Sequence, residues 1–414
     1  MTMYAHEVRK ITYQADIKQF PLLFTFPLSP IALGWGAHQI TGQQLNALGI
    51  KHALIVTTGL RGTGIVEEVE GVVKHAGVAT TIFNKIHSNP RIEDVEEGLK
   101  VYKEAGCDGV LSIGGGSSND VGKMIRLRLA NPDRTLQSMT LLLSPHWEEV
   151  IAGLNPVTVF QVCVNTTAGT GSEVTGFAVV TDWEKHFKFA VAAIGIAPTF
   201  GIDDPALMRT MPTHLAAQTG MDCLCHSIVG VLSRIENEIS KAVGLLGTEL
   251  VWENLPEFVY NRWNDKACEK MAWAQYVGAA TYGMGGGTDA IHAIAHQISA
   301  VNDMHHGLSN AIMMVPVTRY NIPAAAGKME YLARHVCGID TRNMTRFQAA
   351  EAFVNELEKF RNLVGITDIK LGNYGLKEAD CKHIASSSRN DIVIEGNARD
   401  MTPDDVEALL KSML

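Results

Sequence analysis

The first half of the chain alternates short apolar runs with amphipathic stretches. The run His52–Thr58 is typical of a buried strand, and the stretch Ile92–Ala105 repeats its apolar residues at helical spacing, with acids in its first turn. The same patterns predict strands at Ala79–Phe83, Gly109–Ile113 and Val157–Val164, and a helix at Ile65–His75. This β-α-β-α-β order indicates a parallel sheet covered by helices.

The pattern changes near Asp203-Asp204-Pro205. Just before it, the apolar runs Ala178–Asp182 and Phe187–Ala193 flank a charged turn and predict a hairpin. Beyond it, helical periodicity predicts helices at His214–Ser233, Ile239–Asn254, Lys266–Thr281, Ala290–Val301, Thr345–Val364 and Pro403–Met413. We therefore expect an α/β dinucleotide-binding domain over residues 1–204 and an all-helical domain over residues 205–414, with a cleft between them.

Composition and charge exclude several classes of partner. The 414 residues are 46% hydrophobic and 19% charged, with a net charge of −9 and no Lys/Arg cluster, so nucleic acid and anionic membranes are not expected as partners. The N-terminal MTMYAHEVRK lacks an apolar signal core, and no apolar run approaches the roughly 18 residues that span a bilayer. Seven cysteines without a CxxC pair suggest free thiols in the cytoplasm.

A glycine-rich segment closes one predicted strand. Gly114-Gly115-Gly116-Ser117 follows Gly109–Ile113 and opens a helix. Glycines let a phosphate approach the backbone, and a helix N-terminus offers free N–H groups to it. The segment is not a GxGxxG fingerprint, and a tight strand-to-helix turn would explain one or two of its glycines. Three glycines in a row before a serine favour a phosphate site.

A second polar loop, Asn165–Glu173, follows the strand predicted at Val157–Val164. It holds four hydroxyl side chains and two glycines, which suit a loop lying against ribose, pyrophosphate or a nicotinamide amide. Taken alone, it could equally be a solvated Ser/Thr turn. Both loops, however, leave the carboxyl ends of predicted parallel strands, where open sheets bind ligands.

The helical half carries a constellation typical of a metal site. Asp222 and His226 are spaced i,i+4, His292 and His296 repeat that spacing, and His306 follows ten residues later. Either pair alone is more often a pair of surface side chains, or contains a core histidine whose hydrogen bonds are already satisfied. Both helices are otherwise apolar, however, and burying such groups without a partner costs several kcal/mol. Three imidazoles and one carboxylate suit Fe²⁺ or Zn²⁺, and on spacing alone His305 could replace His306 as a ligand.

Together these segments resemble the iron-containing (group III) alcohol dehydrogenase family. The motifs that carry the resemblance are GGGSSNDVGK (114–123), TTAGTGSEVT (166–175), DPALMRTMPTHLAAQTGMDCLCHSIVG (204–230), the pair His292 and His296, and His306-Gly307. The resemblance covers nearly the whole chain. It implies the dehydroquinate synthase-like fold, with an N-terminal cofactor domain containing a parallel sheet and a C-terminal helical metal domain.

The resemblance also implies roles for individual residues. The metal ligands would be Asp222, His226, His292 and His306, and His296 would lie near the substrate without binding the metal, as a proton relay. The dinucleotide would be bound by Thr58, Gly115, Gly116, Ser117, Asp120, Thr166, Thr167, Thr170, Lys188 and Leu207.

The implied activity is metal-dependent, NAD(P)-dependent interconversion of a small primary alcohol and its aldehyde. Many relatives that use NAD have Asp where this chain has Thr58, so NADP stays open as a cofactor beside NAD. Within the family, stretches such as TTGLRGTGIVEE (57–68) and HHGLSNAI (305–312) look most like methanol dehydrogenases that retain their nicotinamide and reoxidise it with an added acceptor. The chain departs from the family at Val229, Gln297 and His305, where Glu, Pro and Pro are common.

Two other functions are compatible with part of this pattern. A dehydroquinate-synthase-like lyase would need Lys and Arg for a phosphorylated, carboxylated substrate, and none lies close in sequence to the metal motifs. A non-catalytic assembly or dinucleotide-sensing protein would not need all four ligands and both loops. The resemblance further implies a homo-oligomer, from a dimer up to a decamer.

Overall fold

The structure, a computed structural model, describes residues 28–142 and 147–414, so the N-terminal segment considered above lies outside the described residues. Its first half is built on a six-stranded, all-parallel sheet in the order β1-β8-β5-β4-β2-β3. The strands are β1 (Ile31–Leu33), β2 (His52–Thr57), β3 (Ala79–Phe83), β4 (Gly109–Gly114), β5 (Gln161–Asn165) and β8 (Phe200–Asp203). This confirms the predicted parallel sheet.

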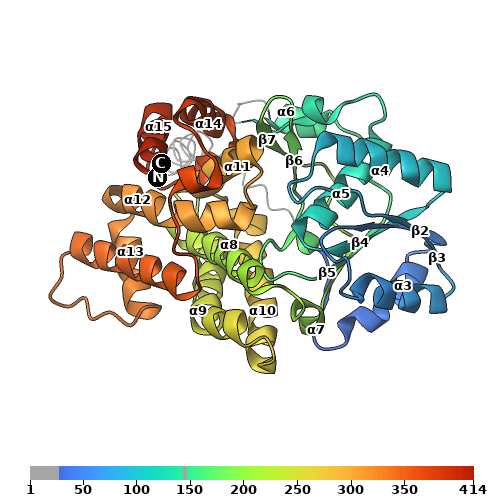
Figure 1. The fold of residues 1–414 in the computed structure, drawn as a ribbon, viewed down its shortest axis with the longest axis horizontal. Helices are drawn as coiled ribbons and strands as arrows, with labels where there is room; N and C mark the ends of the chain where they lie inside the picture. Colours follow the sequence, from blue (N-terminus) through green and yellow to red (C-terminus); the bar gives the residue numbers. More distant parts are fainter. Residues whose placement is uncertain (1–27, 143–146) are drawn as a thin grey trace, which may run out of the picture.

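Helices cover both faces of this sheet, with α3 on one side and α4 and α5 on the other (Figure 1). The helices of this half are α2 (Thr41–Ala47), α3 (Ile65–His75), α4 (Ile92–Ala105), α5 (Gly116–Ala130) and α6 (Trp147–Ala152). Along β2, Leu54 and Val56 enter the core under α4 and α5, whereas Ala53 and Ile55 enter the core under α3. Since both faces are buried, the strand is apolar throughout, which explains its unbroken signal in the sequence.

The predicted hairpin forms beside this sheet. Strands β6 (Ala178–Asp182) and β7 (Phe187–Val191) pair antiparallel, with Thr181 opposite Lys188. The strand expected at Val157–Val164, by contrast, begins only at Gln161. Val157 is buried, but its N–H donates to the carbonyl of Ile194 rather than to a strand of the sheet.

The second half is helical, as predicted, and packs around one large apolar core. Its helices are α7 (Pro205–Met208), α8 (Thr213–Leu232), α9 (Glu238–Tyr260), α10 (Asp265–Thr281), α11 (Ala290–Asn302), α12 (His306–His335), α13 (Arg346–Leu363), α14 (Glu378–Asn390) and α15 (Pro403–Ser412). A π-helical turn, η4 (Tyr282–Gly286), follows α10, and a 3₁₀ turn, η6 (Ile392–Gly396), follows α14. Further 3₁₀ turns are η1 (Ala37–Ile40), η2 (Leu136–Met139), η3 (Ser172–Val174) and η5 (Leu371–Tyr374).

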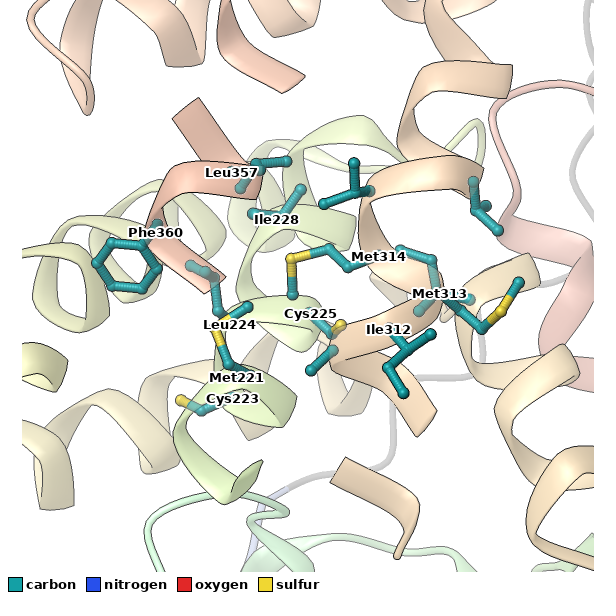
Figure 2. Close-up of a cluster of buried hydrophobic side chains, with 14 of the residues drawn as sticks. Met221, Cys223, Leu224, Cys225, Ile228, Ile312, Met313, Met314, Leu357 and Phe360 are labelled. Atoms are coloured by element: carbon teal, nitrogen blue, oxygen red, sulfur yellow. The ribbon is translucent and has the colours of Figure 1, made fainter. Parts of the chain in front are cut away.

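Helix α8 lies at the centre of the helical half. By length and hydropathy it could cross a membrane, but 89% of its apolar window is buried inside the fold, so it is a core helix. Figure 2 shows its packing against α12 and α13 through Met221, Leu224, Cys225, Ile228, Ile312, Met313, Met314, Leu357 and Phe360. Cys223 and Cys225 are both fully buried and pack in this core. This packing fixes the rotation of α8, and therefore the direction in which its polar face points.

Candidate functional site

One cleft, with a cavity volume of about 360 Å³, brings the two sequence-predicted loops and the predicted metal residues together. On one side it is lined by the segments that follow β2, β4 and β5 and by Lys188 of β7. On the other side it is lined by residues of α8, α11 and the start of α12. The cleft therefore lies between the carboxyl edge of the parallel sheet and the helices that carry the histidines.

The glycine-rich segment is packed tightly against the second loop. A Cβ on Gly115 would lie 2.7 Å from the side chain of Thr167, and one on Gly116 would lie 2.9 Å from that of Thr170. These glycines therefore allow the two loops to touch, in addition to leaving the backbone open toward the cleft. Helix α5 begins at Gly116, so its free N–H groups face the same space.

A buried lysine and a partly buried aspartate hold these loops in place. Lys123 donates from Nζ to Ser172 Oγ at 2.8 Å and to the carbonyl of Phe177 at 2.6 Å, and it also lies 3.3 Å from Asp120 Oδ1. Asp120 in turn accepts from Ser172 Oγ and from the N–H of Val179. The carboxylate of Asp120 is thus engaged within the protein, although the residue borders the cleft.

The ten predicted dinucleotide residues divide into two groups. Eight of them line the cleft: Thr58, Gly115, Gly116, Ser117, Asp120, Thr167, Thr170 and Lys188. The other two do not line it. Thr166 is buried with its N–H donating to the carbonyl of Gly114, and Leu207 is buried in the apolar core under α3. Their positions support the loops and the sheet from behind.

The predicted metal residues converge from three helices. The Oδ1 atom of Asp222, on α8, lies 3.6 Å from Nε2 of His292 on α11 and 3.6 Å from Nε2 of His306 on α12. One ligand atom from each of these residues lies within 4.8 Å of the others. His226 stands slightly apart, with Nε2 4.0 Å from Asp222 Oδ1 and its ring stacked on that of His292.

The chemistry of this cluster fits a divalent metal. Both ring nitrogens of His292 and the Nδ1 atoms of His226 and His306 are buried without a hydrogen-bond partner. Unpaired buried polar atoms are costly, and three imidazoles with one carboxylate form a donor set suited to Fe²⁺ or Zn²⁺. Burial lowers the pKa of His226 to about 4, which keeps its imidazole neutral and able to bind a metal. Burial opposes ionisation of Asp222, but the neighbouring histidines hold the pKa of that carboxyl below its ordinary value.

The structure separates the two adjacent histidines that spacing alone could not separate. His306 is the first residue of α12 rather than part of an isolated turn, and it is this residue that meets Asp222. His305 precedes the helix as its N-cap residue. It lines the cleft but is not part of the cluster of Asp222, His292 and His306.

His296 borders the same cleft without joining the cluster. Its Nδ1 lies 2.8 Å from Oδ2 of Asp391, a buried residue at the start of η6. Such a contact fixes the ring and leaves Nε2 for the cleft. Sequence reasoning missed Asp391 because 95 residues separate it from His296 and no local pattern joins them.

Two further polar residues near the site were also missed. Asn310 donates from Nδ2 to Asp222 Oδ1 at 2.7 Å, and its place one turn after His306 is a signal that could have been read from the sequence. Asn89 accepts from Nζ of Lys188 at 3.0 Å. Burial lowers the pKa of Lys188 to about 8, against the raising influence of several nearby carboxylates.

A buried carboxyl pair lies behind the second loop. Glu173 and Asp203 are both fully buried, and one amide group, Nε2 of Gln275 on α10, donates to Oε1 of Glu173 at 3.2 Å and to Oδ2 of Asp203 at 2.6 Å. Asp203 also accepts from Asn165. Burial raises the pKa of Glu173 to about 7 and raises that of Asp203 as well. This pair connects the sheet to the helical half close to the cleft.

Comparison with known families accounts for most of the chain. The model of the family described as iron-containing alcohol dehydrogenase matches residues 29–205. The model described as Fe-containing alcohol dehydrogenase family, C-terminal, matches residues 216–414. The first match covers the loops that border the cleft, and the second covers the histidine-bearing helices.

Individual relatives match over similar lengths. The chain is 38% identical to a methanol:N,N-dimethyl-4-nitrosoaniline oxidoreductase of Mycobacterium sp. (strain DSM 3803 / JC1), over 85% of this chain and 82% of the relative. It is 34% identical to an NAD-dependent methanol dehydrogenase of Bacillus methanolicus, over 92% and 97% of the two chains. Among solved structures, a 1,3-propanediol oxidoreductase superposes with a TM-score of 0.85 at 30% identity, covering 94% of this chain and all of the other.

Proposed function

This chain belongs to the iron-containing alcohol dehydrogenase family, and we propose that the cleft is where it interconverts a small primary alcohol and its aldehyde. The activity is a nicotinamide-dependent alcohol oxidoreduction, in keeping with the methanol and propanediol dehydrogenases it resembles. The observation that carries the proposal is that one cleft is bordered both by the glycine- and threonine-bearing loops and by the Asp222 cluster. Family membership favours this activity over the lyase and over a non-catalytic role.

Asp222, His226, His292 and His306 are the proposed metal ligands, with Fe²⁺ as the preferred ion and Zn²⁺ as the alternative. The unpartnered Nε2 of His292 and the approach of the other two histidines, each through Nε2, to the single carboxylate support this assignment. When bound, the metal supplies a Lewis acid that polarises the substrate oxygen and favours the alkoxide. Asn310 holds the Asp222 carboxylate in orientation through its hydrogen bond to Oδ1.

The eight predicted residues that line the cleft are proposed to bind NAD or NADP, with Thr166 and Leu207 supporting them from behind. When bound, the nicotinamide supplies the hydride acceptor or donor. The side chain of Thr58 is uncharged and donates to the carbonyl of Ile86. This position therefore has no acidic group that would repel a 2′-phosphate and no basic group that would bind one. We therefore propose weak discrimination between the two dinucleotides.

The protein's own groups position the reactants and handle the proton. His296, fixed by Asp391 at Nδ1, is proposed to hold the substrate proton at Nε2. Lys188 offers its ammonium to the cleft, where only Asn89 is a hydrogen-bond partner among the described residues. The two loops bordering the cleft pack too closely to admit a Cβ at Gly115 or Gly116, so glycine at these positions allows the loops to touch.

A second candidate is a nicotinoprotein that keeps its dinucleotide bound and returns the hydride to an added acceptor. The 38% identity to a methanol:N,N-dimethyl-4-nitrosoaniline oxidoreductase favours this version. Exchange of free dinucleotide remains the main proposal, since the NAD-dependent methanol dehydrogenase matches a larger share of both chains.

The cellular setting is also proposed. All seven cysteines are free, which supports a reducing compartment such as the cytoplasm. Large apolar side chains, including Trp263 and Tyr260, stand exposed on the helical half and support self-association into a homo-oligomer. Residues 1–204 and 205–414 are proposed as the cofactor and metal domains.

The metal assignment is tested by His292→Ala. Removing this imidazole should abolish bound metal, measured by elemental analysis of the purified protein, and should abolish alcohol oxidation with it. Binding of NAD(P)H, measured by its fluorescence, should persist because His292 lies outside the two loops. Ser299→Ala, a buried change on the same helix, is the control and should keep both metal and activity. Full metal occupancy in His292→Ala would refute the ligand set.

A further inference from the structure

The carboxamide of Gln297 pairs with the main chain of Lys188. Gln297 is fully buried on α11, directly after His296. Its Nε2 donates to the carbonyl of Lys188 at 2.9 Å, and its Oε1 accepts from the N–H of Lys188 at 3.3 Å. A single side chain thus satisfies both main-chain groups of one residue, as a neighbouring strand would.

This pairing occurs on the outer edge of the hairpin. Lys188 stands opposite Thr181 in the β6–β7 pair, and its N–H and carbonyl point away from β6, toward α11. Buried main-chain groups without partners are costly, so an edge strand in this position needs a substitute for the missing neighbour. Gln297 is that substitute, and it is borne by the same helix as His292.

The side chain of Lys188 is also connected to the helical half, through Asn89 of the first half. Nζ donates to Asn89 Oδ1 at 3.0 Å, and Nδ2 of Asn89 donates onward to Asp303 Oδ1 at 2.9 Å and to the carbonyl of Met304 at 3.2 Å. Asp303 and Met304 form the turn between α11 and α12. Both ends of Lys188 are therefore tied to segments that lead into His292 and His306.

We propose that Gln297 is a positioning residue for Lys188. By clamping the main chain of β7 to α11, it sets where the Lys188 ammonium stands relative to the metal-bearing helix, and so where the dinucleotide is held. The inference rests on the proposed function, because it takes Lys188 as a dinucleotide contact. It adds a residue that touches neither dinucleotide nor metal and acts through another side chain.

The test is a double-mutant cycle between Gln297→Met and Lys188→Met, read out as the dissociation constant of NAD(P)H from its fluorescence. Methionine keeps the length of glutamine but makes neither hydrogen bond to Lys188, and it also loses the 3.5 Å contact from Nε2 of Gln297 to Oδ2 of Asp391. We expect Gln297→Met to weaken dinucleotide binding about tenfold and Lys188→Met to weaken it further. The double variant should match Lys188→Met, because a clamp has no effect once the group it positions is gone.

A second variant and a control keep the outcome decisive. Gln297→Glu keeps an acceptor for the N–H of Lys188 but, when ionised, cannot donate to its carbonyl, so its binding should fall between wild type and Gln297→Met. Ser299→Ala removes a buried hydrogen bond within α11, from Ser299 Oγ to the carbonyl of Ala295, and should bind dinucleotide like wild type.

Unchanged affinity in both Gln297 variants would overturn the proposal. The proposal would also be overturned if the loss of affinity in the double variant equalled the sum of the losses in the two single variants. Such additivity would indicate a structural effect that does not act through Lys188. A wild-type chain that binds no dinucleotide would instead refute the proposed function, which separates the two failures.

Discussion

Replacing Glu173 with Gln should stabilise the protein, and only above a certain pH. Glu173 shares one amide donor, that of Gln275, with the buried carboxyl of Asp203, and its Oε2 atom has no hydrogen-bond partner. Burial raises the pKa of Glu173 from 4.5 to about 7. In the unfolded chain the same carboxyl is exposed to water and ionises near its ordinary value.

The sign follows from proton binding. Between pH 4.5 and about 7 the folded state binds more protons at this site than the unfolded state, so stability falls as the pH rises through this window. The accumulated loss at pH 8 is on the order of 3 kcal/mol at 1.36 kcal/mol per pKa unit. Glu173→Gln removes the ionisation while keeping the shape of the side chain. The free energy of unfolding should therefore rise by up to this amount at pH 8 and by little near pH 5.

The assay is urea unfolding of wild type and variant from pH 5 to pH 9 at constant metal concentration. The difference between the two midpoints at each pH reports the ionisation of Glu173 together with its coupling to Asp203, because titration of the histidine cluster is common to both proteins. Glu253→Gln, an exposed change on α9, is the control and should follow the wild-type profile. A constant difference across the pH range, or a variant less stable at pH 8 than at pH 5 relative to wild type, would refute the reasoning.

Two further predictions concern the dinucleotide. Thr58→Asp should shift the preference of the enzyme toward NAD by a few kcal/mol at most, since repulsion of a 2′-phosphate at the rim of a cleft is screened. The ratio of the kcat/KM values for NAD and NADP measures this shift. A wild-type enzyme that already excludes NADP by a large factor would contradict the prediction. If the dinucleotide is retained, gel-filtered protein should show nicotinamide absorbance. It should also oxidise alcohol with an added dye or aldehyde as acceptor, with ping-pong kinetics. A strict requirement for added NAD(P) would exclude retention.

The sequence predicted elements where one pattern dominated. β2 and α4 were placed to within a residue because one is apolar throughout and the other is strongly amphipathic. Helix α12 was not predicted, since Pro316 and Pro323 interrupt its pattern and its first residue, His306, belongs to a His-His pair before a glycine that is typical of a turn. The short strands β1 and β8 were also missed, because three or four residues carry too little periodicity to stand out.

For the candidate site, the sequence supplied residues that act through local spacing or family motifs. Asp222 and His292 each stand four residues before a histidine on the same helix, which marks them in the sequence. The fold then brings the two helices together. Asp391, Asn89 and Gln297 act across long separations, 95 to 215 residues, and their partners were set by packing alone. Such supporting contacts carry no local signature, and only the folded chain reveals them.

The position of β8 within the sheet has a consequence for how the protein is made. β1 pairs only with β8 among the strands of the sheet, and β8 also closes the open side of β5. Among the described residues, the first strand of this sheet to leave the ribosome therefore pairs only after the last one has been made, and until Phe200–Asp203 emerges the nascent sheet presents β5 as an unpaired edge. Exposed edges of this kind recruit other strands, and long-range pairing is slow. A stalled or truncated chain that ends before β8 should thus be prone to aggregation and a substrate for chaperones, whereas a chain released just beyond it can already complete its sheet.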